Sequence, residues 1–198
     1  MTPVSVTGRP YGVDMDPDAS ISLPSIGIDG GVAAWPHHGR AAELVRELKY
    51  GRATAVVSEL ADRLAAISPT ADLVTWVPAS PARRRQRGFD QSELLARAVA
   101  RRRRLPARRL LRRTDDAPQT ARDVAGRLRG PSLIGVGRRL RLRPTVIVVD
   151  DVSTTGASLA AAAGVVRARG AGTIVGLVVT VAPSDSAVRH RPPAGSIV

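Results

Sequence analysis

The chain has no cysteine, a single lysine and few aromatic residues. Without cysteine, it can form no disulfide, no thiolate nucleophile and no cysteine-ligated zinc site. Aromatic residues make up 3% of the sequence, so a core must be built from Val, Leu, Ile and Ala. No apolar run approaches the roughly 20 residues needed to cross a bilayer, and the N-terminus has neither the basic start nor the apolar core of a signal peptide. We therefore expect a cytoplasmic protein without a membrane partner.

The length of the chain limits the number of domains, and its charge indicates the kind of ligand that it attracts. At 198 residues the chain is long enough for one substantial core and too short for two full domains. Its formal net charge is +13, and every one of its 30 basic residues except Lys49 is arginine. The segment 83–143 holds 20 of these arginines against five acids. A field of that sign attracts pyrophosphate, nucleotides or nucleic acid without specifying which.

The most informative part of the chain is Val146–Leu159, which reads VIVVDDVSTTGASL. Val146–Val149 is a continuous run of branched apolar residues, typical of a strand that is buried on both faces of a parallel sheet. Asp150 and Asp151 are expected to end this strand. The small polar residues that follow lead into a predicted helix over Leu159–Arg169, where apolar positions recur at helical spacing.

A strand, a polar loop and a helix in this order suit a phosphorylated sugar. The start of a helix leaves backbone N–H groups unpaired and carries a partial positive charge, so a loop of small residues there can wrap a phosphate. Gly156 lets the backbone come close, and the neighbouring hydroxyls add donors. Asp150 and Asp151 can accept hydrogen bonds from sugar hydroxyls or hold a hydrated Mg²⁺. The alternative is an ordinary strand-to-helix turn in which Asp and Ser side chains cap the helix.

The remaining segments have distinct patterns. Residues 1–40 are rich in Pro, Gly, Asp and Ser and are expected to be irregular for the most part, with candidates for short strands at Ile21, Ile26, Ile28 and Val32. Residues 184–198 are expected to form a disordered tail. Between them we expect one domain over residues 41–183. Helices are predicted over Ala41–Tyr50, from Gly51 to Ile67 and from Asp90 to Arg104; strands over Leu73–Val77, Arg108–Arg113, Ser132–Val136 and Thr173–Val181; and a mobile loop over Asp115–Gly130.

A basic loop is predicted after the strand at residues 73–77. Pro78–Pro81 stops this strand, and the arginine-rich run Arg83–Arg87 follows. Guanidinium groups match phosphate oxygens in bidentate fashion, so the loop would suit a diphosphate. A solvated run of charges is the alternative. Asp90 and Glu93 fit a capping box at the start of the next helix.

The alternation of strands and helices predicts an α/β fold, with a parallel sheet and helices on both of its faces. Ligands of such sheets lie beyond the carboxyl ends of the strands. Pro78 and Asp150 both fall at such ends. The basic loop and the acidic pair are therefore expected to face one ligand.

The motif Val146–Ser158 resembles the phosphoribosyl pyrophosphate (PRPP) binding motif of type I phosphoribosyltransferases. Further stretches in matching order extend the resemblance to the ComF family of competence-associated, amidophosphoribosyltransferase-like proteins, over roughly residues 41 to 182. These stretches are Lys49–Arg52, Val77-Pro78 with the basic run behind it, Arg87–Gln91 and Pro118-Gln119. Taken alone, Lys49–Arg52 indicates only a helix break at Gly51 with solvated charges. The resemblance implies a type I phosphoribosyltransferase-like sheet with a small N-terminal hood segment.

The same resemblance implies a Mg²⁺ cofactor, with PRPP and pyrophosphate as ligands. It assigns PRPP binding to Asp150, Asp151, Ser153, Thr154, Thr155, Gly156, Ala157 and Ser158. It places the pyrophosphate beside a loop that includes Pro78, Ala79, Ser80, Arg83 and Arg84. Asp150 and Asp151 would face the ribose hydroxyls and the metal, and together with Arg127 they are the candidate catalytic residues.

The sequence departs from the family pattern at several points. Many relatives begin with a cysteine zinc ribbon, which this chain cannot form. Asp90 stands where the family usually has Asn, and Arg127 is the candidate for the arginine of an Arg and Asn pattern whose Asn is missing. Thr154 occupies the position of the Asp base of hypoxanthine-type enzymes, which argues against 6-oxopurine salvage. No lysine follows Lys49 to match the mobile-loop lysine of orotate-type enzymes, so Arg127 or another loop arginine would have to neutralise the leaving pyrophosphate.

Three functions remain open at this stage. The first is a phosphoribosyltransferase that moves a 5-phosphoribosyl group to an unknown nitrogenous acceptor and releases pyrophosphate. The second is a non-catalytic competence or DNA-uptake protein whose arginine-rich face binds single-stranded DNA or a helicase partner. The third is a PRPP sensor without turnover. The acidic pair favours ligand binding, while the missing lysine favours a sensor or a module over an enzyme; a homodimer is also left open.

Overall fold

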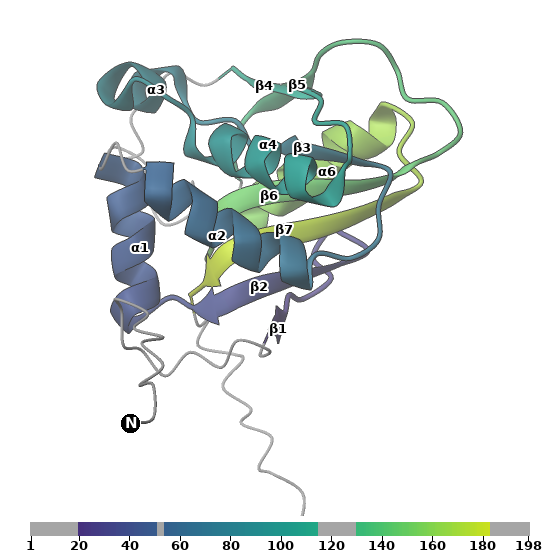
Figure 1. Ribbon diagram of the computed structural model, residues 1–198. Helices are drawn as coiled ribbons and strands as arrows, with labels where there is room; N and C mark the ends of the chain where they lie inside the picture. Colours follow the sequence, from purple (N-terminus) through teal and green to yellow (C-terminus); the bar gives the residue numbers. More distant parts are fainter. Residues whose placement is uncertain (1–19, 51–53, 115–129, 183–198) are drawn as a thin grey trace, which may run out of the picture.

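A five-stranded sheet in the order β1-β2-β7-β6-β3 forms the centre of the computed structural model, which describes residues 20–50, 54–114 and 130–182 (Figure 1). Four of the strands pair in parallel. They are β2 (Gly30–Pro36), β7 (Thr173–Val181), β6 (Thr145–Ser153) and β3 (Leu73–Trp76). The two-residue β1 (Ile21–Ser22) pairs with β2 in the antiparallel sense. The predicted α/β fold with a parallel sheet is therefore confirmed.

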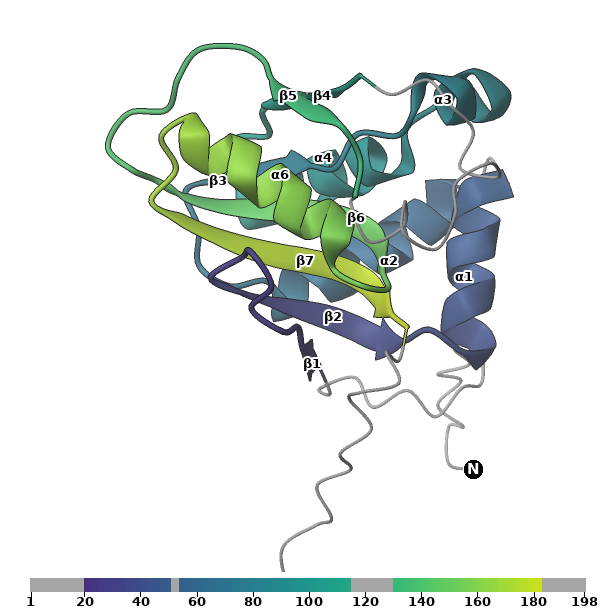
Figure 2. The ribbon, with the colours of Figure 1, turned by 180° about the vertical axis from the view of Figure 1, so that it is seen from behind.

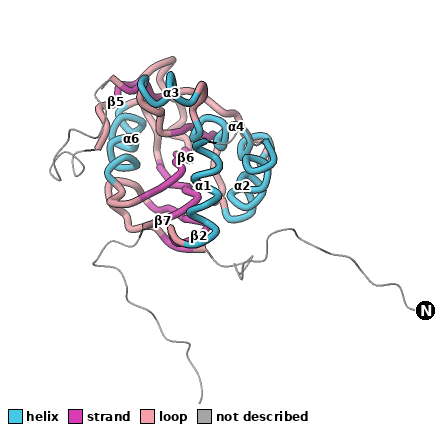
Figure 3. Tube along the Cα trace, turned by 90° about the vertical axis from the view of Figure 1, so that its left-hand side faces the viewer, coloured by secondary structure: helices cyan, strands magenta, loops and turns pink. Residues whose placement is uncertain are grey.

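Helices cover both faces of this sheet, as predicted. α1 (Gly39–Tyr50), α2 (Thr54–Ile67) and α4 (Gln91–Arg103) lie on one face, and α6 (Ala157–Ala168) lies on the other (Figures 1 and 2). The view along the sheet in Figure 3 separates the two helical layers. Among the described residues, no helix is both long enough and apolar enough to span a membrane.

Two smaller elements complete the described chain. The short helix α3 (Pro81–Arg87) follows β3. β4 (Leu111–Arg113) and β5 (Leu133–Gly135) pair antiparallel as a separate ribbon, which packs against α6. Both strands fall inside the segments predicted to be extended.

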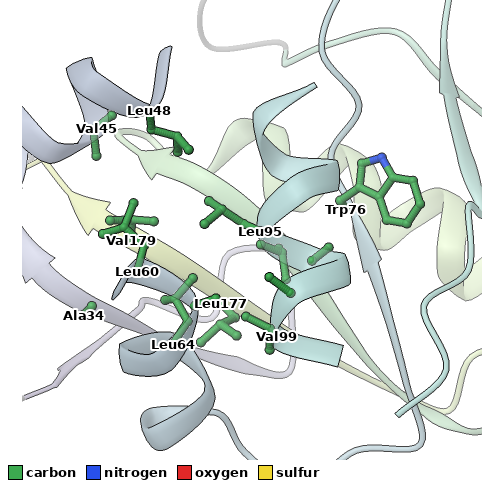
Figure 4. Close-up of a cluster of buried hydrophobic side chains, with 14 of the residues drawn as sticks. Ala34, Val45, Leu48, Leu60, Leu64, Trp76, Leu95, Val99, Leu177 and Val179 are labelled. Atoms are coloured by element: carbon green, nitrogen blue, oxygen red, sulfur yellow. The ribbon is translucent and has the colours of Figure 1, made fainter. Parts of the chain in front are cut away.

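β6 is buried on both faces because its successive side chains point into different layers. Val146 and Val148 join the cluster beneath α6, whereas Ile147 and Val149 join the cluster beneath α1, α2 and α4. All four side chains are fully buried. Figure 4 shows the second cluster, in which leucines of the three helices meet Leu177 and Val179 of β7. The continuous apolar run at residues 146–149 thus reflects a strand enclosed by two helical layers.

The expectation that residues 1–40 are irregular is wrong for residues 30–36. These residues form β2, which pairs with β7 in the register Ala33 with Val178. The sequence of β2, GGVAAWP, contains too few β-branched residues to predict a strand of this length. These residues form a strand because they pair with β7. The expected domain boundary at residue 40 therefore separates β2 from the strands with which it forms the central sheet.

Two local expectations also need correction. Asp150 and Asp151 do not end the strand, because β6 continues through both of them to Ser153, paired with β7. The arginine-rich run at 83–87 is not a loop but the helix α3, with Pro at its first position and Ser80 as its N-cap. The expected mobile loop, except for Gly130, and the expected tail at 184–198 lie outside the described residues.

Gly31 provides a test of the β2–β7 contact. A Cβ added at Gly31 would lie 2.8 Å from the carbonyl oxygen of Gly176 on β7, whereas a Cβ added at Gly30 meets nothing within 4 Å. We expect Gly31→Ala to lower the free energy of unfolding by about 1–3 kcal/mol through overpacking. Gly30→Ala, the matched control, should leave it unchanged or raise it by less than about 1 kcal/mol. Urea unfolding of both variants measures the difference, and equal stabilities would contradict the close contact.

Candidate functional site

Two adjoining cavities open at the carboxyl end of β6. The first, here called the loop cavity, has a volume of about 320 Å³ and is lined by the chain from Val152 to Leu159, with Asp150, Arg83 and Gly130. The second, here called the basic cavity, has a volume of about 280 Å³. Asp150 and Arg83 line both cavities, so the two form one cleft.

The loop cavity surrounds the start of α6, which no side chain caps. Gly156 is the N-cap residue and has φ +75°, a left-handed conformation that glycine adopts without steric cost. Among the described residues, one side-chain hydrogen bond reaches the first turn, and it is long: the Ala157 N–H donates to the Thr155 hydroxyl at 3.4 Å. Thr154 and Thr155 are exposed and Ser158 is half-buried. This helix start therefore presents N–H and hydroxyl donors to the cavity.

The other two helix starts near the cleft are closed by their own side chains. The Ser80 hydroxyl accepts from the Arg83 N–H at 3.3 Å, and the Asp90 carboxylate accepts from the Glu93 N–H at 3.2 Å. The predicted cap at Asp90 is therefore confirmed. At α6, by contrast, the N-cap residue is Gly156, and no side-chain cap hydrogen bond closes the helix start.

Asp150 lies almost out of solvent at the boundary between the cavities, with 8% of its surface exposed. Its Oδ1 accepts from the Ser92 hydroxyl at 3.0 Å and from the Asp151 N–H at 2.9 Å. Burial raises the pKa of Asp150 well above its usual value, and the neighbouring charges of Asp151 and Asp90 raise it further. Burial therefore makes ionisation of Asp150 less favourable in the folded protein than in water.

Asp151 faces the other way, toward α1. Its Oδ2 lies 3.2 Å from the Nζ of Lys49, and its Oδ1 accepts from the Val152 N–H at 2.9 Å. Both side chains of this ion pair are partly buried. His37 lies nearby, and its pKa is lowered, mainly by burial and also by the charge of Lys49. The chain's single lysine is thus fixed at the cleft rather than solvated.

The basic cavity gathers cations and unpaired donors. Its lining includes Lys49, Arg83, Arg87 and Arg113. The Arg87 guanidinium lies 5.4 Å from the ring centroid of Tyr50. The buried Nε of Arg87 and the buried Nε2 of Gln91 have no hydrogen-bond partner among the residues that the structure describes. Buried donors without a partner are costly, so both atoms point to an acceptor group that enters the cavity.

The predicted pyrophosphate loop contributes less than expected. Pro78 and Ala79 line the basic cavity, but the Ala79 N–H donates to the Asp90 Oδ2 at 2.8 Å and is already occupied. Neither Ser80 nor Arg84 lines either cavity, because Ser80 caps α3 and Arg84 lies on a part of that helix turned away from the cleft. Arg127 and Pro118-Gln119 lie outside the described residues.

Several residues of the cleft were missed by sequence reasoning. Gln91 was the last residue of the matching stretch Arg87–Gln91 but was given no role in the site, and Ser92 carried no signal of its own. Gly130 packs so closely on the start of α6 that an added Cβ would lie 2.6 Å from the Ala157 carbonyl oxygen. Taken alone, the stretch Lys49–Arg52 indicated solvated charges, but Lys49 is partly buried and pairs with Asp151. The resemblance to the ComF family included this stretch without giving Lys49 a role.

The residues present fit a Mg²⁺ ion that arrives with a phosphorylated ligand. Mg²⁺ prefers oxygen donors and keeps several waters, and it is usually held by one or two carboxylates together with substrate phosphates. Asp150 and Asp151 supply such carboxylates at the cleft. Among the described residues there is no group of three or more potential metal ligands. The fit is therefore to a metal shared with a ligand, not to a metal bound by the protein alone.

Of three comparisons with known proteins, only the one with solved structures found similar proteins. No protein-family model and no curated protein matches it. One similar solved structure is that of the allosteric regulatory enzyme of purine biosynthesis, with 20% identity, a TM-score of 0.46 and coverage of 68% of this chain. Another is the glutamine PRPP amidotransferase from B. subtilis, complexed with ADP and GMP, with 22% identity, a TM-score of 0.44 and 66% coverage. The chain spans 30% of the length of each of these proteins.

The buried carboxyl of Asp150 predicts a pH-dependent stability. Because its pKa is raised in the folded state, its contribution is fully present below the usual carboxyl value of about 4 and is lost as the pH rises through the folded-state pKa. Asp150→Asn keeps an acceptor for Ser92 and removes the buried charge. We expect this variant to be more stable than the wild type at pH 7, by an amount on the order of 1 kcal/mol. The advantage should vanish near pH 4.

Urea unfolding at the two pH values measures this difference. Asp151→Asn is the matched control, because it removes a neighbouring carboxylate that is partly exposed and paired with Lys49. An Asp150→Asn variant that is less stable than the wild type at both pH values would show that burial is not the dominant influence on this carboxyl.

Proposed function

We propose that the cleft binds PRPP together with Mg²⁺, and that the protein is a phosphoribosyltransferase of the ComF type. In this proposal it transfers a 5-phosphoribosyl group to a nitrogenous acceptor and releases pyrophosphate. The observation that carries the proposal is the uncapped start of α6, which opens into the loop cavity beside Asp150 while a cavity rich in cations adjoins it.

The 5-phosphate is proposed to occupy the loop cavity. A phosphate there would accept hydrogen bonds from the N–H groups of the first turn of α6 and from the hydroxyls of Thr154, Thr155 and Ser158. The helix dipole adds to the attraction. Gly156 keeps the backbone close, and Gly130 brings the neighbouring chain against the same helix start without a side chain in between.

The ribose is proposed to lie between the two cavities, over Asp150 and Asp151. Carboxylate oxygens there can accept hydrogen bonds from the ribose hydroxyls. Lys49 holds the Asp151 side chain in place, and the Ser92 hydroxyl holds that of Asp150. A Mg²⁺ ion bound beside Asp150 would lower the cost of ionising this carboxyl, which burial makes unfavourable in the protein on its own.

The pyrophosphate is proposed to occupy the basic cavity. Arg83 and Lys49 line it as cations, and the unpaired donors Arg87 Nε and Gln91 Nε2 find acceptors in the diphosphate oxygens. Arginine suits this role because its planar donors match phosphate oxygens in pairs. The Arg87 guanidinium already rests on the Tyr50 ring, which limits its freedom before the ligand binds.

The proposed chemistry is displacement at C1 of the ribose, where the bond to pyrophosphate breaks as the bond to nitrogen forms. Cations of the basic cavity stabilise the negative charge that gathers on the departing pyrophosphate. When bound, Mg²⁺ supplies further neutralisation of the diphosphate. Arg127 remains a proposed contributor to the same task. The depth of the site on the buried strand β6 helps to keep water from the reacting carbon.

Calorimetric titration with Mg²⁺ and PRPP tests the proposed site. We expect saturable binding to the wild type and at least about a tenfold loss of affinity in the Asp150→Asn, Asp151→Asn double variant, because the ribose and metal lose both anionic partners. The fold should remain, as far-UV circular dichroism would show. Unchanged affinity in the double variant would overturn the site assignment. If PRPP binds but no pyrophosphate is released with any of a panel of nitrogenous acceptors, the protein is a PRPP sensor and not an enzyme.

Lys49 gives a second test within the same cleft. Lys49→Gln removes the cation that lines the basic cavity and that pairs with Asp151, so we expect the affinity for pyrophosphate to fall by about tenfold. Arg46→Gln is the matched control, because Arg46 is an exposed cation of the same helix that lines neither cavity. Equal losses of pyrophosphate affinity in the two variants, measured by the same titration, would show that Lys49 acts only through the overall charge of the protein.

A further inference from the structure

A third cavity, of about 580 Å³, lies at the amino end of β3 and β6, at the opposite end of the sheet from Asp150. We call it the amino-end cavity. Its walls include the apolar side chains of Leu73, Pro106, Leu140 and Pro144. In Figure 1 the connection from β5 to β6, which supplies half of the lining, lies at the right, away from the arrowheads of β2 and β7.

Four arginines and one acid supply the charges of this cavity. Arg139 donates to the Ala168 carbonyl oxygen at 3.0 Å. The side chains of Arg108, Arg138 and Arg141 make no hydrogen bond or ion pair with the described residues. The acid, Asp72, uses its Oδ2 to accept from the Thr145 N–H at 2.7 Å. The cavity thus holds cationic donors that the fold itself does not use.

The segment that carries Arg138, Arg139 and Arg141 is anchored by backbone hydrogen bonds. The Leu140 N–H donates to the Arg169 carbonyl at 2.8 Å, and the Gly172 N–H donates to the Pro144 carbonyl at 3.0 Å. Between these anchors, Leu142 and Arg143 both have positive φ, 65° and 47°, which is strained for residues with side chains. The Leu142 side chain is 99% exposed, so packing does not account for this turn.

We propose that the amino-end cavity is a second ligand site, which binds a nucleoside phosphate. Free guanidinium groups of Arg108 and Arg141 would hold the phosphates. The proline and leucine walls, with the flat faces of the arginines, would hold a planar base. The remaining oxygen of Asp72 is an acceptor for a ribose hydroxyl or an exocyclic amine. A volume of about 580 Å³ is of the size that small-molecule ligands occupy.

This site is separate from the proposed PRPP cleft, since the two share no lining residue. It is nevertheless linked to β6 through one lining residue. The N–H of Thr145, the first residue of β6, donates to Asp72 at the amino-end cavity, and Asp150 lies five positions further along that strand. A nucleotide bound here would therefore contact a side chain that is hydrogen-bonded to the strand carrying the acidic pair.

Fluorescence titration with N-methylanthraniloyl-ADP, at an ionic strength of about 0.15 M, tests the proposal. The wild type should bind the probe saturably, and the Arg108→Gln, Arg141→Gln double variant should bind it at least about tenfold more weakly. ADP should displace the probe, whereas adenosine or inorganic phosphate alone should compete poorly. Two controls accompany the pocket variant: Arg46→Gln, Arg112→Gln, which removes two exposed arginines elsewhere, and Asp150→Asn, Asp151→Asn, which alters the cleft.

Both controls should bind the probe within about twofold of the wild type, because neither changes the amino-end cavity. An equal loss of probe affinity in the Arg46 and Arg112 variant would overturn the proposal, because it would show that binding depends only on net charge. A change in probe affinity that occurs only in the Asp150 and Asp151 variant would overturn it, because it would show that the probe binds in the cleft. Displacement by a thymidine oligonucleotide at a far lower nucleotide concentration than ADP would overturn the free nucleotide as the ligand, in favour of a single strand.

Discussion

The complete burial of β6 is the constraint on which the rest of the structure depends. Its apolar residues are sealed by α6 on one face and by three helices on the other, so the strand has no freedom to shift its register. The hydrogen-bonded strand then continues through Asp150 and Asp151. Two carboxyl groups are thereby carried to the edge of a rigid core, where one is buried and the other meets Lys49.

The chemistry of the cleft follows from that placement. A buried carboxyl that resists ionisation, unpaired donors on Arg87 and Gln91, and a helix start without a cap are each unfavourable for the protein alone. All of them lie within one cleft, and the proposed ligand, which brings phosphates and a metal ion, would relieve each of them. Natural proteins hold such unfavourable features where function needs them, and the neighbouring helices α3 and α4 show that this chain caps helices elsewhere.

The sequence predicted the elements whose pattern is local. The strand Thr173–Val181 and the cap at Asp90 agree with the structure, because a buried apolar run and a capping box are written in consecutive residues. It offered only a short strand at Val32 and did not predict the full length of β2 or its place in the central sheet, because its small residues become a strand through pairing with β7. Nor did it predict the role of Lys49 or the unpaired Gln91, because those depend on helices brought to the cleft from distant parts of the chain.

The central claim, that the cleft at the carboxyl end of β6 holds PRPP, is tested most directly by a crystal structure of the protein with Mg²⁺ and PRPP. The account predicts the 5-phosphate against the N–H groups at the start of α6, the ribose hydroxyls beside Asp150 and Asp151, and the diphosphate beside Arg87 and Gln91. A cleft that stays empty at saturating PRPP, or PRPP bound only in the amino-end cavity, would contradict it.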